Sequence, residues 1–147
     1  MIQDFITSNE LNAQLLKFPS DVSIDKALST AKLNISSYAK ASPFVNEKMD
    51  FFVVISIASE KVNIEVAEDL FDENLNEVDH SEVLKLTGFE KNTFPPISIF
   101  GAKSVFTKEA KKQKKLIFQL SPREYLVIDI ESIEKSQELS DYFFEEK

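Results

Sequence analysis

Hydrophobic residues recur along the chain at spacings that predict a mixture of helices and strands. Apolar positions three and four residues apart favour helices, whereas alternation, or a short run of β-branched and aromatic residues, favours strands. These patterns predict helices over residues 2–8, 24–33, 64–71, 83–87, 108–112 and 131–144. They predict strands over residues 38–45, 51–58, 104–107, 115–120 and 125–130. Residues 11–18 fit a helix face as well as an alternating strand, and both interpretations stay open.

Polar residues and one glycine mark the ends of several of these helices. Ser23 and Asn63 each precede a helical pattern and are expected to be N-caps, because their side-chain oxygens can accept from free backbone N–H groups. A further helix is capped by Asp79 or Ser81. That helix is expected to end at Gly88, which adopts a left-handed conformation without strain.

The order of these elements predicts a single domain over residues 1–147. The strand over residues 51–58 is apolar almost throughout, which is typical of a central strand that is buried on both faces. The consecutive prolines Pro95 and Pro96 can neither continue a helix nor donate to a strand ladder, so residues 89–101 are expected to form a loop. We therefore expect an α+β fold with a curved mixed sheet, partly closed into a barrel and flanked by helices.

The composition excludes most familiar kinds of active site. The 147 residues include no cysteine, one histidine and two glycines. Disulfides, cysteine nucleophiles and zinc sites built from cysteines or several histidines are therefore excluded. The glycines, Gly88 and Gly101, are too far apart for a Walker A loop or a dinucleotide-binding turn. We expect no metal and no cofactor, and we interpret the single histidine, His80, as part of a helix cap.

The start of the chain and its longest apolar run bear on where the protein is found. The first residues lack the basic and apolar regions of a signal peptide. The longest nearly apolar run, residues 51–58, is far shorter than the roughly 20 residues of a membrane-spanning helix. Together with the absence of cysteine, these features predict a cytoplasmic protein.

One basic stretch stands out in an otherwise acidic chain. The formal net charge is −8, yet residues 83–123 contain nine basic and two acidic residues. The lysines are densest at Lys108, Lys111, Lys112, Lys114 and Lys115. This stretch fits either a solvated helix face with its turn or a patch that contacts phosphates. The acidic total argues against indiscriminate binding to DNA.

Four segments, in order, resemble one protein family. Lys40 lies in the predicted strand 38–45, which follows the helix that begins after Ser23. The buried run 51–58 is followed by the helical segment Val62-Asn63-Ile64-Glu65-Val66-Ala67. Thr87-Gly88-Phe89 ends a helix six residues before Pro95-Pro96, and residues 116–128 resemble a closing hairpin. In this order and spacing, roughly three quarters of the chain resembles the YbaK family, which includes the editing insertion domain of bacterial prolyl-tRNA synthetase and free-standing relatives.

The resemblance implies aminoacyl-tRNA deacylation, the hydrolysis of the ester that joins a wrong amino acid to the terminal adenosine of a tRNA. It implies a catalytic role for Lys40, which would place positive charge at the ester or the tRNA end. The loop that the family uses to shape its pocket falls on Gly88, Phe89, Asn92, Thr93, Phe94, Pro95, Pro96 and Ser98. The family's paired loop glycines are replaced by Asn92 and Thr93, and its later glycine by Ser98. The lysines expected to meet tRNA phosphates are Lys111, Lys112, Lys114 and Lys115.

Other interpretations stay open beside the deacylase. On sequence alone Lys40 also fits an exposed strand lysine. The chain also fits a non-catalytic module that binds tRNA, another oligonucleotide or a protein, with an aminoacyl-tRNA synthetase as one candidate partner, or a regulatory domain. An open cleft that holds the Lys40 amine against the 88–98 loop would favour catalysis. A cleft filled by Thr93, Phe94 or Ile97 would favour binding alone.

Overall fold

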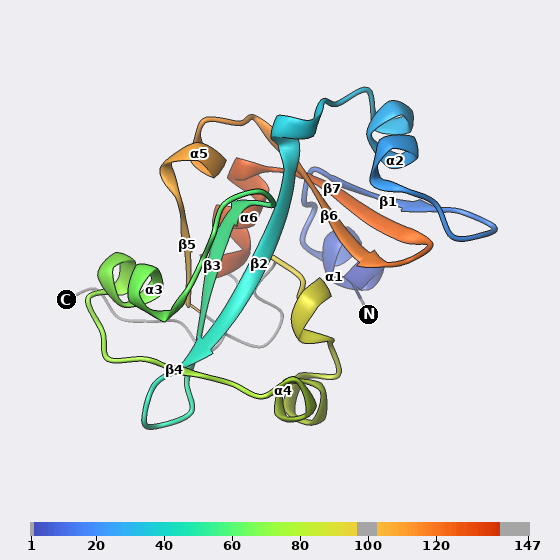
Figure 1. The fold of residues 1–147 in the computed structure, drawn as a ribbon. Coiled ribbons are helices and arrows are strands. Elements are labelled where there is room, and N and C mark those ends of the chain that lie inside the picture. Colours follow the sequence, from blue (N-terminus) through green and yellow to red (C-terminus); the bar gives the residue numbers. More distant parts are fainter. Residues whose placement is uncertain (1, 97–102, 139–147) are drawn as a thin grey trace.

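The computed structural model describes residues 2–96 and 103–138. Its helices are α1 (Ile2–Ser8), α2 (Ile24–Ala31), α3 (Ile64–Phe71), α4 (His80–Thr87), α5 (Lys108–Lys111) and α6 (Ile130–Glu138), with short 3-10 helices η1 (Ile35–Ser37) and η2 (Lys91–Thr93). Its strands are β1 (Ala13–Lys17), β2 (Tyr38–Val45), β3 (Phe51–Ile57), β4 (Asn76–Glu77), β5 (Lys103–Phe106), β6 (Lys115–Ser121) and β7 (Glu124–Asp129). The predicted mixture of helices and strands is therefore confirmed (Figure 1).

The strands form one mixed sheet that does not close into a barrel. Their order is β1-β7-β6-β2-β3-β5, and β4 pairs with β2 beside this path. The pairs β2/β6 and β3/β5 are parallel and the others are antiparallel. The expectation of a partly closed barrel is wrong, because closure requires the first and last strands to pair. Within the described residues β1 and β5 are instead two separate edges of the sheet.

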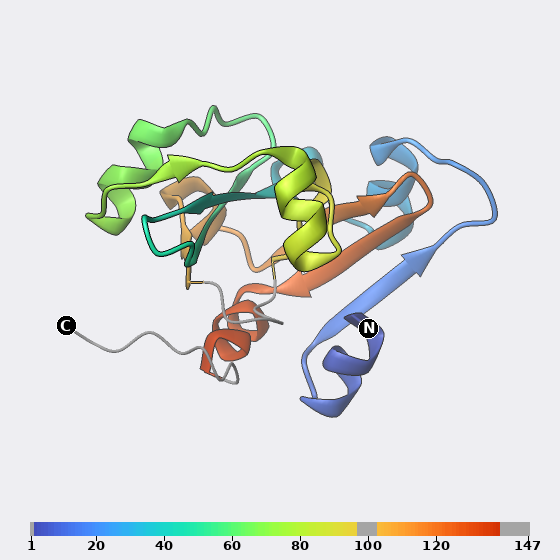
Figure 2. The ribbon, with the colours of Figure 1, turned by 90° about the horizontal axis from the view of Figure 1, so that it is seen from below.

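Side chains from both faces of this sheet are buried. On one face a large cluster joins the sheet to α4 and α6 through residues such as Val83 and Ile133. The opposite face carries two separate clusters, one beneath α2 with Leu28 and one beneath α3 with Ala67. Figure 2 shows α2 and α3 on one side of the sheet and α1 and α6 on the other. Burial on both faces agrees with the continuous apolar run predicted for β3.

The helix ends follow the predicted caps. Ser23 Oγ accepts from the N–H of Lys26 at 3.3 Å, and Asn63 Oδ1 accepts from the N–H of Val66 at 3.0 Å. Asp79 is the N-cap residue of α4, although its side chain makes no cap hydrogen bond. Gly88 ends the same helix with a φ of 80°, in the left-handed region that glycine adopts without strain.

The structure decides the secondary structure of several segments that the sequence left open or did not predict. The segment that fitted both a helix and a strand contains β1, which pairs with β7 along its full length. The predicted loop contains the short helix η2, and β4 was not expected. The end of the closing helix predicted over residues 131–144, and the end of the loop with Ser98, lie outside the described residues. No helix in the described ranges is both long and apolar enough to cross a membrane.

Candidate functional site

Along one face of the sheet, the even-numbered residues of β2 are aromatic at both ends of the strand and polar in the middle. Tyr38 packs against the cluster beneath α2, and Phe44 belongs to the cluster beneath α3. Lys40 and Ser42 lie between them, each partly exposed. Successive side chains of a strand alternate between faces, so these four share the face covered by α2 and α3. The interval between the two clusters therefore presents an ammonium and a hydroxyl group where the rest of the face is packed.

The pairing of β2 is interrupted at the same place. On the side away from β3, β6 pairs with residues 38–39 and β4 pairs with residues 44–45. Residues 40–43 have no strand partner on that side among the described residues. The carbonyl of Tyr38 points toward β3, because it accepts from the N–H of Ala58, the residue after β3, at 2.7 Å. Because hydrogen-bonding directions alternate along a strand, the N–H and carbonyl of Ala41 point into this gap, together with the carbonyl of Pro43, which has no N–H.

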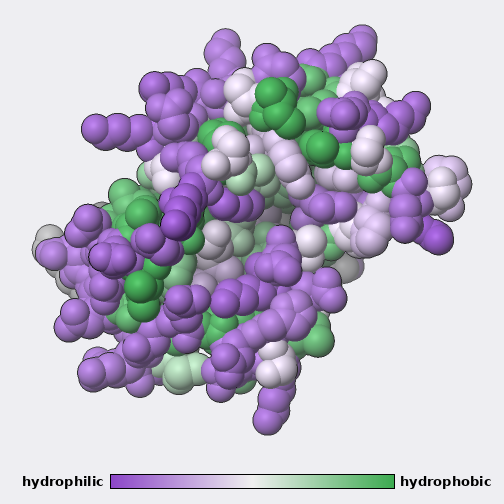
Figure 3. Space-filling view, in the orientation of Figure 1, coloured by the Kyte–Doolittle hydropathy of each residue, from purple (hydrophilic) through white to green (hydrophobic). Residues whose placement is uncertain are grey.

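A pocket of about 240 Å³ occupies this gap. Its walls come from four parts of the chain: β2, the segment before α3, β4 and η2. The lining residues are Lys40, Ala41, Ser42, Pro43, Phe44, Val62, Asn63, Glu77, Lys91 and Asn92. Figure 3 shows this face of the molecule, where the surface is recessed near the centre and bordered mainly by hydrophilic residues.

Lys40 is held at the pocket by a backbone carbonyl. Its Nζ donates to the carbonyl oxygen of Glu60. The Glu60 carboxylate in turn accepts from the N–H of Ile57 at 2.8 Å and from Thr107 Oγ1 at 2.6 Å, which fixes the turn after β3. Lys40 forms no ion pair with any described carboxylate. Since an ammonium group has three N–H donors, Lys40 retains donors and a charge for a ligand.

The short helix η2 brings a second cation and an amide to the same pocket. Lys91 Nζ donates to the carbonyl oxygen of Val78 at 2.8 Å, and Asn92 lines the pocket beside it. On the opposite wall Asn63 uses its Oδ1 to cap α3, which leaves its amide N–H groups as donors. The pocket therefore combines two ammonium groups, one carboxylate and several neutral hydrogen-bonding groups.

The structure places some of the predicted pocket residues together and others elsewhere. Lys40 and Asn92 line the same pocket, whereas the predicted loop residues Gly88, Phe89, Thr93, Pro95 and Pro96 do not line it. Phe94 is only 2% exposed and packs in the core cluster on the other face of the sheet. Its ring centroid lies 6.3 Å from that of Phe51, so Phe94 does not fill the pocket. Ser98 and Ile97 lie outside the described residues.

No family model matches the chain, and no curated protein matches its sequence. Solved structures do match its fold. One is described as "a putative trans-editing enzyme for prolyl tRNA synthetase", with a TM-score of 0.72 and 16% identity over 92% of this chain and 88% of that one. The chain shares this fold. A hypothetical protein matches with a TM-score of 0.75 and 16% identity over 93% of each chain. A scaffold protein used for computational epitope grafting matches with a TM-score of 0.73 and 14% identity.

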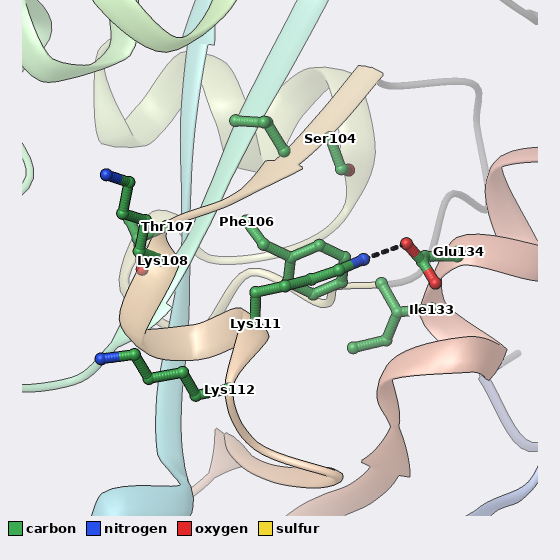
Figure 4. Close-up of a pocket in the computed structure, with 9 residues that line it drawn as sticks. Ser104, Phe106, Thr107, Lys108, Lys111, Lys112, Ile133 and Glu134 are labelled. Carbon is green, nitrogen blue, oxygen red and sulfur yellow. Dashed lines mark hydrogen bonds and ion pairs between the residues drawn. The ribbon is translucent and has the colours of Figure 1, made fainter.

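The basic segment, defined here as residues 108–115, lies on α5 and the start of β6. The ammonium of Lys111 forms an ion pair with Glu134 and lies 5.0 Å from the centroid of the Phe106 ring. Figure 4 shows this pair across a hollow of about 700 Å³ between β5 and α6. Lys108 and Lys112 also line the hollow, but their ammonium groups point away from the pair. Such exposed pairs contribute about 0–1 kcal/mol, so a phosphate can compete for the lysine.

The other predicted phosphate-binding lysines differ in their surroundings. Lys112 Nζ lies 3.0 Å from the carboxylate of Glu109, one turn earlier in α5. Lys114 and Lys115 are exposed. Glu109 also lines a hollow of about 640 Å³, together with Ile35, Ser36, Tyr38, Ile57, Ala58, Ser59, Glu60 and Gln113. Because Glu60 lines this hollow and its carbonyl accepts from Lys40, which lines the pocket, the hollow and the pocket are neighbours.

Two lining residues of the pocket were not predicted from the sequence. Glu77 reaches it through β4, a strand of two residues whose position depends on its pairing with β2. Lys91 reaches it through η2. Neither residue belongs to a local pattern that signals a site. Among the described residues, no group of three or more histidine, aspartate and glutamate side chains could hold a metal ion.

Proposed function

We propose that the protein is an aminoacyl-tRNA deacylase that hydrolyses the ester of mischarged tRNA. The observation that carries this proposal is the pocket that holds the Lys40 ammonium together with Asn92, which follows Gly88 in the chain. The resemblance to the YbaK family implied that these two parts of the chain would meet. The fold shared with a putative trans-editing enzyme supports the same activity, although a likeness at 16% identity concerns the fold alone.

The reaction requires water, a positioned ester and a group that stabilises negative charge. The oxygen of a water molecule attacks the carbonyl carbon, the bond to the ribose oxygen breaks, and that oxygen receives a proton. In the family the substrate's own ribose hydroxyl is thought to assist, so no histidine or cysteine is needed. The Lys40 ammonium provides the positive charge for the carbonyl oxygen as it becomes negative. Its anchor on the Glu60 carbonyl fixes this charge without neutralising it.

The sizes of the hollows match the parts of this substrate. The pocket of about 240 Å³ has room for a small aminoacyl group. The neighbouring hollow of about 640 Å³, which Tyr38 and Ile57 line, offers an aromatic and an apolar surface for the terminal adenosine. The basic segment lies beyond this hollow and would meet the phosphates of the acceptor end. Size alone discriminates weakly between amino acids, because one methylene changes binding by about 1–3 kcal/mol.

The proposal is tested by measuring the release of amino acid from a panel of mischarged tRNAs. We expect the wild-type protein to hydrolyse at least one of them. We expect Lys40→Ala to lower kcat/KM by about 100-fold or more, which is the usual loss when a group that stabilises an oxyanion is removed. Lys48→Ala is the matched control, because Lys48 is an exposed lysine in the turn between β2 and β3. Equal activity of the wild type and Lys40→Ala would contradict the assigned role.

The same panel separates catalysis from binding alone. Tight tRNA binding without turnover of any ester would identify the protein as a non-catalytic tRNA-binding module. The open pocket favours the deacylase, because neither Phe94 nor Thr93 lines it. Binding that is insensitive to salt would argue against contacts with tRNA phosphates in either case.

A further inference from the structure

Glu77 is the only carboxylate among the described residues that line the pocket. The two cations of the pocket are already tied to backbone carbonyls, Lys40 to that of Glu60 and Lys91 to that of Val78. Glu77 has neither an ion pair nor a side-chain hydrogen bond within the described residues. Its negative charge is therefore available to a ligand, whereas the other charged side chains of the pocket, Lys40 and Lys91, are positive.

The register of β4 fixes where this carboxylate lies. Glu77 is directly opposite Phe44 on β2, and residues opposite each other in an antiparallel pair project from the same face. Lys40 lies four residues before Phe44, which is about 13 Å along a strand, on that same face. Glu77 and Lys40 thus enter the pocket from its two ends and form no ion pair with each other.

The substrate of the proposed function carries a positive charge close to its ester. Its carbonyl oxygen becomes negative during hydrolysis, and its α-carbon bears an ammonium group. A pocket that contained only the two lysines would repel this ammonium group. We propose that Glu77 binds the α-ammonium group of the aminoacyl ester, so that the pocket selects esters with a free α-amino group. This inference rests on the proposed function.

A consequence is that esters with an acylated α-nitrogen, such as the ester of a peptidyl-tRNA, are poor substrates. Such a nitrogen is neutral and leaves the Glu77 carboxylate without a partner beside the ester. The pocket would then remove single amino acids from tRNA and spare growing peptides.

The test compares an aminoacyl-tRNA with the α-hydroxyacyl-tRNA made from the same amino acid, which has almost the same size but no positive charge. Each rate is divided by the spontaneous hydrolysis rate of its ester. We expect the wild type to prefer the aminoacyl ester by at least tenfold and Glu77→Gln to lose most of this preference. Glu47→Gln, an exposed carboxylate in the turn after β2, should keep it. An equal rate for both esters in the wild type, or an unchanged preference in Glu77→Gln, would overturn the role of Glu77 while leaving the deacylase activity in place.

A binding measurement separates this result from a failure of the proposed function. The probe is 3′-amino-3′-deoxyadenosine linked by an amide to an amino acid, compared with its α-hydroxy counterpart. We expect the wild type to bind the ammonium form at least tenfold more tightly and Glu77→Gln to bind both forms alike. This outcome in a protein that hydrolyses no ester would support the Glu77 contact and refute the deacylase. Equal binding of both forms by the wild type would overturn the contact.

Discussion

At the scale of single residues, the environment of Lys40 differs from that of a typical strand lysine. The residue directly opposite it on β3 is Ser56, which is fully buried. The Ser56 hydroxyl has no hydrogen-bond partner among the described residues. A buried hydroxyl without a partner loses its hydration and gains nothing in return, which makes the folded state less stable. The strand pair that presents the catalytic candidate therefore carries a local cost in stability.

Removing this hydroxyl should stabilise the protein. We expect Ser56→Ala to raise the free energy of unfolding by about 1 kcal/mol, which corresponds to a rise in Tm of about 2–4 °C. Ser132→Ala is the contrasting variant, because Ser132 Oγ accepts from the N–H of Asn12 at 2.8 Å. It should lower the stability by about 1 kcal/mol. Thermal and urea unfolding measure both changes, and a destabilised Ser56→Ala would show that this hydroxyl has a favourable contact.

The position of the Lys40 charge should matter as much as its presence. We expect Lys40→Arg to fold but to retain below about a tenth of the proposed deacylase activity. The planar guanidinium is wider than an ammonium group and distributes its charge over three nitrogens, so it cannot occupy the same place at the Glu60 carbonyl. Steady-state kinetics on the best mischarged tRNA measure this effect. Full activity of the arginine variant would mean that positive charge anywhere near the pocket is sufficient.

At the scale of elements, the start of α6 is tied to the beginning of the chain. Asp129 Oδ1 accepts from the N–H of Ser132 at 2.8 Å, and its Oδ2 accepts from Asn12 Nδ2 at 2.7 Å. Burial alone would raise the pKa of Asp129. The hydrogen bonds from Ser132 and Asn12 and the charge of Lys115 outweigh burial and lower the pKa below its ordinary value of 3.8. The ionised carboxylate therefore stabilises the folded state.

The stability that the protein loses when this carboxylate is removed should depend on pH. Because the pKa of Asp129 is lowered in the folded state, its contribution is fully present above the ordinary value of 3.8 and is lost as the pH falls through the folded pKa. We expect Asp129→Ala to lower stability by about 1 kcal/mol at pH 7, as for other side chains that cap the start of a helix, and by progressively less as the pH falls below 3.8. Asp21→Ala, which breaks an exposed pair with Arg123, should cost less at every pH. Urea unfolding between pH 2 and pH 7 checks both, and a pH-independent loss would contradict the charge argument.

The helices and strands also show which features of the fold are determined by neighbouring residues in the sequence. Ser23, Asn63 and Gly88 were predicted correctly because caps and left-handed ends depend on residues within one turn. β4 was missed because two residues carry no periodicity, and only their pairing with β2 makes them a strand. The barrel was wrong for a related reason, since closure depends on contacts between strands that are distant in sequence.

At the scale of the whole molecule, an acidic protein has its proposed tRNA-binding lysines in one segment. Each lysine that contacts a phosphate should change the slope of log K against log salt concentration by roughly 0.7–0.9. We expect the double variant Lys114→Ala/Lys115→Ala to reduce this slope by about 1.5. The double variant Lys111→Ala/Lys112→Ala should reduce it less, because both ammonium groups already pair with carboxylates. Binding titrations with tRNA between 50 and 300 mM salt measure the slopes, and identical slopes for all three proteins would exclude this segment as the contact.

The candidate site shows where sequence reasoning stops at this scale. Lys40 and Asn92 were predicted through the family resemblance, and the structure brings both to one pocket. Phe94 was predicted with them but packs into the core, because a large aromatic side chain beside Phe51 and Phe89 gains more from apolar contact. Glu77 and Lys91 could not be assigned to the pocket from sequence, since their positions depend on how β4 and η2 meet β2.

The interruption in the pairing of β2 also bears on self-association. A long unpaired strand edge invites a strand from another molecule and so promotes aggregation. Here the free edge covers only residues 40–43 and lies inside the sheet, between β6 and β4. That length is below the five to six residues of a typical strand. This gap can thus offer one backbone donor, the N–H of Ala41, and the carbonyl oxygens of Ala41 and Pro43 to a small molecule. It gives a foreign polypeptide too little edge to extend the sheet at this point.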